Sequence, residues 1–245
     1  MKLLYSLALL ALCYSCSPKV GLTLTGSRPP LEEFARVEML DVNDPAPDEA
    51  ERIGRISLGG GKNGCRFEEI LPNLHNHARK AGGNLLKVLR HRVPPKLQGG
   101  CHHVIADIFY MEDLDNVLEA SERAAMRRID TALYNDGCAI IHFYRPSASG
   151  FIVGYDICVG EEAITRARDY SKESVMVKAT GPTTFWAKTE AKVEIEANIL
   201  PGRHYYVRCG ISPGIMVGRP ALMFVSEEIG RPEYDSINTP TKIKD

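Results

Sequence analysis

The sequence predicts an α+β fold, in which a small strand-helix-strand-strand domain is followed by a helical connector and an all-β sandwich domain. Three observations predict it. Apolar residues recur at helical spacing after a glycine cluster, and a polar stretch rich in Ala, Glu and Arg follows. In the second half, short segments alternate between apolar and polar residues. The expected units are a signal peptide (1–15), a lipidated N-terminus and tether (16–50), the α+β domain (51–111), the connector (112–135), the sandwich (136–232) and a C-terminal tail (233–245).

The composition is that of an ordinary globular protein. The 245 residues carry a formal net charge of −1, and 44% of them are apolar. A chain with this charge balance offers no broad basic surface to phosphates, so we expect no nucleic-acid partner. After the N-terminal apolar run, no second run approaches the roughly 20 residues that a membrane-spanning helix needs.

Residues 17–50 are rich in Pro, Ser, Asp and Glu, with scattered apolar positions. This composition favours an extended tether. A short strand over 36–40 is the one element we expect there, because Val37 and Leu40 lie in the longest stretch without strand breakers.

The α+β domain begins with a strand that holds Ile53, Ile56 and Leu58. An amphipathic helix follows, and its apolar positions are Ile70, Leu71, Leu74, Ala78 and Ala81. Gly82 and Gly83 close this helix, and Pro72 is tolerable if the helix begins near Glu69. Two further strands are expected over 85–91 and 104–111.

Residues 112–134 have apolar side chains at helical spacing, which predicts the helical connector. Asn135, Asp136 and Gly137 end it. Beyond them, apolar residues alternate with a period of two in several short segments, which indicates a β-sandwich. The segments contain Ala139 to Phe143, Phe151 to Val159, Val175 to Val177, Val193 to Ala197 and Tyr205 to Cys209.

The first sixteen residues have one lysine, an apolar run and the small Ser15 directly before Cys16. They resemble a bacterial lipoprotein signal with its lipobox, although Cys13 stands where that pattern usually has leucine. The resemblance implies acylation of Cys16 and cleavage before it; a cleaved signal without lipid is the alternative. Ser17 is not the aspartate that retains some lipoproteins in the inner membrane. The implied location is therefore the outer membrane facing the periplasm, with exposure at the cell surface left open.

Residues 136–230 resemble a family of bacterial exported domains known as domain of unknown function 2846. The matching segments are Ala139 to Pro146, Tyr155 to Ile157, Ala187 to Ala191, Pro201 to Val207 and Gly218 to Pro220. This resemblance implies a small β-sandwich and supplies no catalytic residues; the turn at Gly160 to Glu162 departs from the pattern. Residues 81–88 and 101–106 are similar to small periplasmic α+β lipoprotein folds such as the stress-sensor lipoprotein of the Rcs pathway.

Five cysteines remain beyond Cys16, so one is left over if the others pair in an oxidising compartment. Cys65 and Cys101 both stand at element starts, where a disulfide would pin helix to sheet; two buried thiols are the alternative. A bridge between Cys138 and Cys158 requires a hairpin that turns near residue 148. Cys209 shares a strand face with apolar residues, which favours a buried thiol, and a bridge from Cys158 to Cys209 stays open.

The histidines are the nearest approach to a metal site, but their spacing argues against one. His75 and His77 diverge on a helix, and His102 and His103 point to opposite faces of a strand, although one of each pair could meet if the elements are neighbours. The glycine-rich loop 59–64 lacks the order of glycine, lysine and Ser/Thr that a phosphate loop needs. We predict no metal, cofactor or catalytic residue.

These observations favour a non-enzymatic, lipid-anchored cell-envelope protein with a structural, sensing or protein-binding role. We expect contact with the membrane through the N-terminal lipid and with a protein partner in the envelope. A solute-binding or metal-binding lipoprotein is the alternative and would require polar side chains that converge on one pocket. A hydrolase is a more distant alternative, because no Gly-x-Ser-x-Gly motif occurs.

Overall fold

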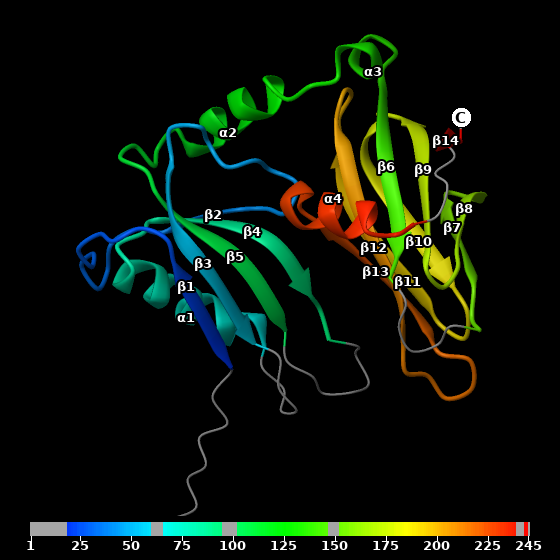
Figure 1. Ribbon diagram of the computed structural model, residues 1–245, viewed down its shortest axis with the longest axis horizontal. Helices are drawn as coiled ribbons and strands as arrows, with labels where there is room; N and C mark the ends of the chain where they lie inside the picture. The colour runs from blue at the N-terminus through cyan, green and yellow to red at the C-terminus, as the bar shows by residue number, and fades with distance from the viewer. Residues whose placement is uncertain (1–18, 60–65, 95–101, 147–151, 239–242, 245) are drawn as a thin grey trace, which may run out of the picture.

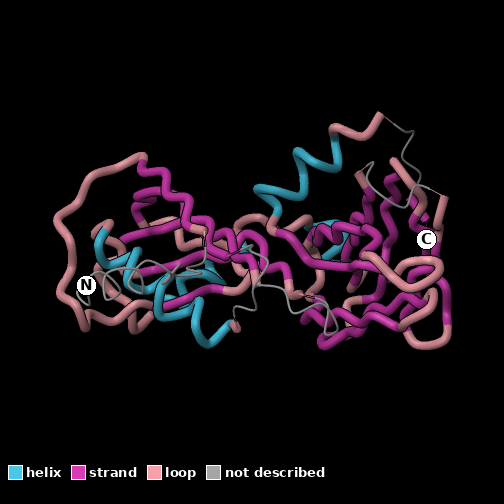
Figure 2. Tube along the Cα trace, turned by 90° about the horizontal axis from the view of Figure 1, so that it is seen from below, coloured by secondary structure: helices cyan, strands magenta, loops and turns pink. Residues whose placement is uncertain are grey.

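The computed structural model describes residues 19–59, 66–94, 102–146, 152–238 and 243–244. They form two lobes that follow one another along the longest axis (Figures 1 and 2). The first lobe is a sheet covered by a helix, and the second is a sandwich of two sheets. The predicted α+β class with a β-sandwich is therefore confirmed.

The first lobe has its strands in the order β1-β3-β5-β4, and β2 pairs with the start of β4. The strands are β1 (Val20–Leu24), β2 (Glu38–Leu40), β3 (Glu51–Gly59), β4 (Leu85–Arg92) and β5 (His103–Tyr110). Helix α1 (Phe67–Lys80) packs on one face through Ile70, Leu74 and Ala78. This apolar core holds the lobe together, while the other face of the sheet carries charged side chains.

Helix α1 begins at Phe67, two residues before the expected start, so Pro72 lies inside it. There the proline removes one backbone hydrogen bond of the helix. Gly82 follows the helix with φ of +81°, a conformation that favours glycine, and a Cβ at this position would lie 2.7 Å from the carbonyl oxygen of Pro29. The expected glycine stop is therefore present.

The expected tether over 16–50 is wrong for its described part. Residues 20–24 form β1, which pairs antiparallel with β3. The expected strand over 36–40 is present as β2 (Glu38–Leu40), which pairs parallel with β4. The five side chains of β1 are all exposed. Backbone pairing with the edge of β3 fixes this strand, and composition does not report such pairing. Leu40 is buried against α2.

The connector contains two short helices, α2 (Val117–Met126) and α3 (Thr131–Asn135). The carboxylate of Asp130 caps α3 by accepting hydrogen bonds from the backbone nitrogens of Ala132 and Leu133, at 2.9 and 3.2 Å. Helix α2 packs on the first lobe through Val117 and Ala120.

The sandwich packs a four-stranded sheet, ordered β11-β10-β7-β8, on the strands β13-β12-β6-β9. Its strands are β6 (Cys138–Arg145), β7 (Tyr155–Val159), β8 (Glu162–Ala167), β9 (Ser171–Lys178), β10 (Gly181–Lys188), β11 (Lys192–Ile199), β12 (His204–Ser212) and β13 (Arg219–Val225). Alternating apolar residues of both sheets, among them Phe143, Phe185 and Val207, fill the space between them.

One sheet runs through both lobes, because β13 pairs antiparallel with β4 at Val225 and Arg90. Helix α4 (Glu227–Asp235) follows β13 and lies against β12 and β4 (Figure 1). The expected division between domain and tail at 232/233 falls inside α4 and is wrong, since Tyr234 of this helix and Ile237 after it are buried in the same apolar cluster as Tyr206. The two-residue strand β14 (Ile243–Lys244) pairs with β9.

Candidate functional site: a charged cleft between the lobes

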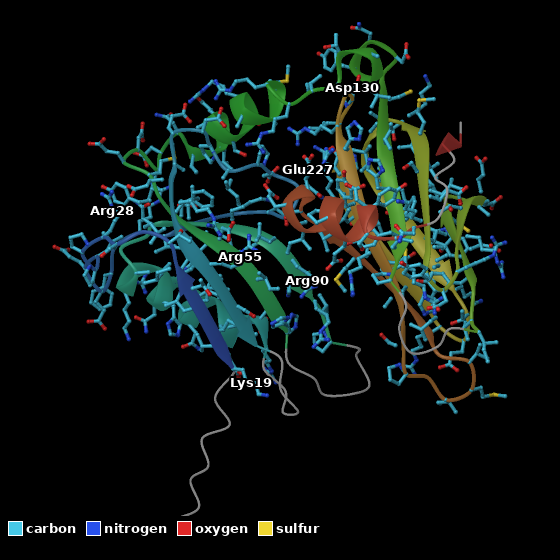
Figure 3. The ribbon with its side chains drawn as sticks, in the orientation of Figure 1. Lys19, Arg28, Arg55, Arg90, Asp130 and Glu227 are labelled. Atoms are coloured by element: carbon cyan, nitrogen blue, oxygen red, sulfur yellow. The ribbon has the colours of Figure 1, made fainter. Side chains whose placement is uncertain are left out.

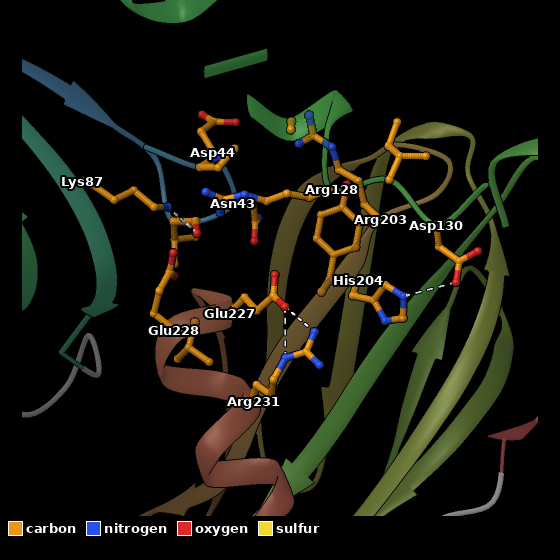
Figure 4. Close-up of a pocket in the computed structure, with 16 residues that line it drawn as sticks. Asn43, Asp44, Lys87, Arg128, Asp130, Arg203, His204, Glu227, Glu228 and Arg231 are labelled. Atoms are coloured by element: carbon orange, nitrogen blue, oxygen red, sulfur yellow. Dashed lines mark hydrogen bonds and ion pairs between the residues drawn. The ribbon is translucent and has the colours of Figure 1, made fainter. Parts of the chain in front are cut away.

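A cleft of about 320 Å³ lies where the two lobes meet (Figure 4). We call it the interlobe cleft. It is lined by Val42, Asn43, Asp44, Pro45, Lys87, Ala125, Arg128, Ile129, Asp130, Arg203, His204, Tyr205, Val225, Glu227, Glu228 and Arg231. This volume is at the small end of the range for ligand pockets in proteins.

Five separate segments form the walls of the interlobe cleft. The loop after β2 and the middle of β4 belong to the first lobe, the end of the connector closes the top, and the start of β12 and the first turn of α4 belong to the second lobe. Figure 4 shows Lys87 and Glu228 on one side and His204 and Asp130 on the other. The site therefore exists only when both lobes are folded together.

Gly202 brings the connector against β12. Its φ is +75°, and a Cβ there would lie 2.7 Å from Ile129 and 3.0 Å from the carbonyl oxygen of Asp130. The nitrogen of Asp130 donates to the carbonyl of Gly202 at 2.9 Å, and the nitrogen of Gly202 donates to Cys138 at 2.8 Å. Only glycine allows this close approach, which places Asp130 at the rim of the cleft.

Lys87 is the most deeply buried charge of the interlobe cleft, with 2% of the residue exposed. Its Nζ donates hydrogen bonds to the carbonyl oxygens of Asp41 and Val42, at 2.6 and 2.8 Å. Burial lowers the pKa of this amine to about 8, and the nearby carboxylates of Glu228 and Asp44 oppose the shift in part. Lys87 thus holds the loop after β2 in place and supplies positive charge to the cleft floor.

The negative charge near Lys87 in the interlobe cleft comes from Asp44 and Glu228. Burial raises the pKa of the Asp44 carboxyl above its ordinary value, while the charges of Lys87 and Arg203 act against that rise. Glu228 is exposed at the start of α4 and interacts with Lys87 through its charge. The charge of a ligand cation in the cleft would offset the cost of burying the Asp44 carboxylate.

The lining contains four acidic and four basic residues, so its formal charge is zero. Some of these groups have partners within the wall. Nε of Arg231 donates to Glu227 at 3.0 Å along α4, and Asp130 caps α3. Nη2 of Arg128 lies 3.7 Å from Asp48, which is outside the lining. Arg203 stands with Asp44 and Glu228 as charges of opposite sign around one space. This pattern suits a solute that carries both a cation and an anion.

A chain of hydrogen bonds runs from the interlobe cleft into the second lobe, beneath α4. Nδ1 of His204 lies 2.9 Å from Nε2 of His142, and Nδ1 of His142 lies 2.8 Å from Oγ of Ser174. That oxygen lies 2.8 Å from the hydroxyl of Tyr234. At the cleft end, Nε2 of His204 lies 4.0 Å from Asp130.

Both imidazoles in this chain are held neutral. Burial, together with the neighbouring charges of His204 and Arg231, lowers the pKa of His142 to about 3. Burial also lowers the pKa of His204, against the opposing effect of Asp130. Ser174 is 3% exposed, so no substrate can reach its hydroxyl, and a serine-histidine nucleophile is not available here. The chain therefore fixes His204 in the cleft wall and does not form a hydrolytic site.

The histidines singled out in the sequence do not converge. His75 and His77 lie on α1, and His103 bonds Ser57 at 2.9 Å. His102 meets His91, with 2.8 Å between Nδ1 and Nε2. Among the residues that the structure describes, no three His, Cys, Asp or Glu side chains are grouped to hold a metal ion.

The cysteine predictions have mixed outcomes. Cys138 and Cys158 carry free buried thiols, and the expected bridge between them is wrong because β6 pairs with β9 and β12, whereas β7 belongs to the other sheet. Cys209 is a buried thiol as predicted, and burial raises its pKa to about 12. The Cys158 to Cys209 alternative is excluded, since both thiols are free. Cys16, Cys65 and Cys101 lie outside the described residues.

Sequence reasoning missed every residue of the interlobe cleft. Lys87 stands inside a run that reads as a buried strand, and a lysine there is the one signal that indicated a special site. Asp44 and His204 had no distinguishing pattern.

Comparison with known proteins adds no relative: no family model, no curated protein and no solved structure matches the chain. The family resemblances of the two domains therefore stay predictions. Across the described ranges, no helix is long and apolar enough to span a bilayer.

Proposed function

We propose that this chain is a non-enzymatic, lipid-anchored cell-envelope protein that senses or carries a small polar solute in the interlobe cleft. The observation that supports this most is the convergence of charged side chains from both lobes on one space of about 320 Å³. A flat protein-binding module would not need such a cleft, so the solute-binding alternative gains over a purely structural role.

The solute we propose is a zwitterion such as a free amino acid or a short peptide. Its ammonium group would bind between Asp44 and Glu228, and its carboxylate would bind Arg203. The zero formal charge of the lining disfavours ligands that carry only one sign.

The proposed anchor is the acylated thiol of Cys16, and the proposed location is the outer membrane facing the periplasm. Support comes from the apolar run and the small residue before Cys16 in the sequence. An envelope location would expose the interlobe cleft to the small solutes of the periplasm.

Ligand-induced thermal stabilisation tests the solute proposal. The purified chain is heated with single zwitterionic amino acids and dipeptides, and with amines and carboxylates of equal size. A true ligand at a hundred times its Kd raises the stability by about 2.7 kcal/mol. This corresponds to a rise in Tm of about 5 to 10 °C for a protein of this size.

Arg203→Ala and Glu228→Ala should each abolish the shift. Arg92→Ala and Glu162→Ala remove exposed charges outside the cleft lining and should preserve it. If no zwitterion shifts the Tm, or if the cleft variants respond like wild type, the solute proposal is wrong.

A further inference from the structure

Three apolar side chains stand in solvent at the tip of the β12–β13 hairpin. Ile215 and Met216 are each 89% exposed, and Val217 is 51% exposed. Exposed apolar clusters on a soluble protein commonly mark a surface that contacts a partner or a membrane. We call residues 214–217 the apolar tip.

The fold holds the apolar tip in one shape. The carboxylate of Glu190 accepts hydrogen bonds from the backbone nitrogens of Ile215, Met216 and Val217, at 2.9, 3.0 and 3.3 Å. Thr189 donates to the carbonyl oxygen of Gly218 at 2.6 Å. Because the backbone amides of the tip face Glu190, its side chains face outward. These hydrogen bonds therefore fix the exposure of the three apolar side chains.

The start of the described chain and the apolar tip lie at the same edge of the continuous sheet, the first in the first lobe and the second in the sandwich lobe. The nitrogen of Gly59 donates to the carbonyl of Lys19, which places Lys19 at the end of β3. Strand β5 lies between β3 and β4, and its first residue, His103, pairs with the ends of both, so these two ends lie at the same edge of the sheet. Strand β13 runs antiparallel to β4, so its beginning, next to the apolar tip, points toward that same end. Figures 1 and 3 show Lys19, at the beginning of β1, and the turn of the β12–β13 hairpin on the same lower side of the molecule, each in its own lobe.

The distance from the proposed anchor to the fold is short. Cys16 precedes Lys19 by three residues, which span at most about 11 Å when fully extended. The body therefore cannot stand far from a bilayer that holds the acyl chains. Exposed Lys188 and Lys192 flank the Glu190 turn, where they can meet lipid phosphates.

We propose that the apolar tip inserts into the bilayer to which Cys16 is anchored, so that the protein has two points of attachment and a fixed orientation on the membrane. This inference rests on the proposed lipid anchor. The occupant is the acyl-chain region of the bilayer, because the three exposed side chains of the tip are all apolar. Lys188 and Lys192 stand on the adjoining β10–β11 turn, and the Glu190 carboxylate between them is turned onto the backbone amides of the tip.

Depth-dependent quenching tests the insertion. The full-length acylated protein is reconstituted into phosphatidylethanolamine and phosphatidylglycerol vesicles with brominated acyl chains. Trp186→Phe removes the only tryptophan, and Met216→Trp adds a reporter at the tip. The matched control is Phe34→Trp in the same background. Phe34 is 92% exposed and lies near Arg79, at the opposite end of β4.

The expected result is loss of fluorescence and a shift of emission to shorter wavelengths for Met216→Trp, with neither change for Phe34→Trp. The mass of the N-terminal peptide is measured on the same sample. An acylated protein with unquenched Met216→Trp, or equal quenching of both reporters, overturns the insertion and leaves the anchor standing. A Cys16 without acyl mass overturns the anchor, and the insertion with it.

Discussion

Nε2 of His142 lies 2.9 Å from Nδ1 of His204, and the two rings stack with their centroids 5.2 Å apart. Neutral rings satisfy this bond when His142 donates from Nε2 and accepts from Ser174 at Nδ1. Addition of a proton to Nδ1 of His142 would remove the acceptor that Ser174 uses. A proton on His142 would also place a buried positive charge near Arg231, so the folded state favours the neutral ring.

Acid should destabilise the protein through this histidine. The pKa of His142 is about 3 in the folded state and about 6.5 in the unfolded chain, so the unfolded state binds more protons between these values. The stabilisation is complete above pH 6.5 and is lost as the pH falls toward 3. The slope from this group approaches about 1.4 kcal/mol per pH unit.

His142→Gln should flatten the dependence of the unfolding free energy on pH over that window, measured by urea titration between pH 4 and 7.5. His77→Gln is the control, since His77 lies on α1 and no shift of comparable size affects it. Parallel pH curves for wild type and His142→Gln would contradict this account.

Gly230→Ala should destabilise the protein, although alanine normally favours a helix over glycine by about 1 kcal/mol. Gly230 lies inside α4, and a Cβ there would be 2.3 Å from Cβ of Tyr206. The helix would have to move off β12, at a cost of about 1 to 3 kcal/mol in unfolding free energy.

Urea titration of Gly230→Ala measures this cost. Gly21→Ala is the control, because its nearest neighbour, Cβ of Ser57, lies at an ordinary 3.7 Å. The prediction fails if Gly230→Ala is as stable as wild type. The displaced helix should also weaken any ligand response, since α4 forms one wall of the interlobe cleft.

The unfolding free energy of wild type should contain a contribution from Lys87 that rises at alkaline pH, and Lys87→Met should lack it. The pKa of Lys87 is about 8 in the folded state and about 10.4 in the unfolded chain, so the unfolded state binds more protons between these values. Wild type should gain stability relative to Lys87→Met as the pH rises from 8 to 10, by about 1.4 kcal/mol per unit at most.

Unfolding free energies of both proteins at pH 8, 9 and 10 give this difference. The comparison cancels the effect of buried tyrosines such as Tyr206, whose raised pKa acts in both proteins. A constant difference across the three pH values would show that Lys87 keeps an ordinary pKa.

Asp107→Asn should cost about 1 to 3 kcal/mol in unfolding free energy, because Arg52 and Arg55 lose a shared carboxylate. Both arginines bond it, at 2.6 to 3.1 Å, and its side chain is 7% exposed. Burial acts to raise the pKa of Asp107, but the two guanidinium groups outweigh it and the pKa is lowered.

The stabilisation by Asp107 is present above the unfolded pKa of about 3.9 and is lost as the pH falls below it. Asp156→Asn breaks an exposed pair with Arg166 and should cost less than about 1 kcal/mol. Equal losses for the two variants, measured by urea titration at pH 7, would contradict the difference in burial.

Much of the fold could be predicted because its signals are local. Alternation in the second half marks strands such as β6, β7 and β11, and the helical spacing after Glu69 marks α1. Strand β1 could not be found in this way, because its side chains are exposed and its stability comes from backbone pairing with β3. Helix α4 extends into the expected tail, and it was not predicted because its composition is polar.

The interlobe cleft could not be predicted for a different reason. Asp44, Lys87, Asp130, Arg203 and Glu228 come from five segments, and only Lys87, inside an apolar run, is unusual among its sequence neighbours. Their proximity depends on the pairing of β4 with β13, a contact between residues 90 and 225. A charge pattern over such separations becomes visible only in three dimensions.

The outer edge of β4 is covered by two strands from opposite ends of the chain: β2 pairs with its beginning and β13 with its end. During synthesis, half of that edge stays open until the residues around 219–225 have emerged. An open edge can pair with another chain, so a truncated or slowly delivered product would be prone to association. Long-range pairings also form late, which makes the pairing of β13 with β4 the step that joins the two lobes.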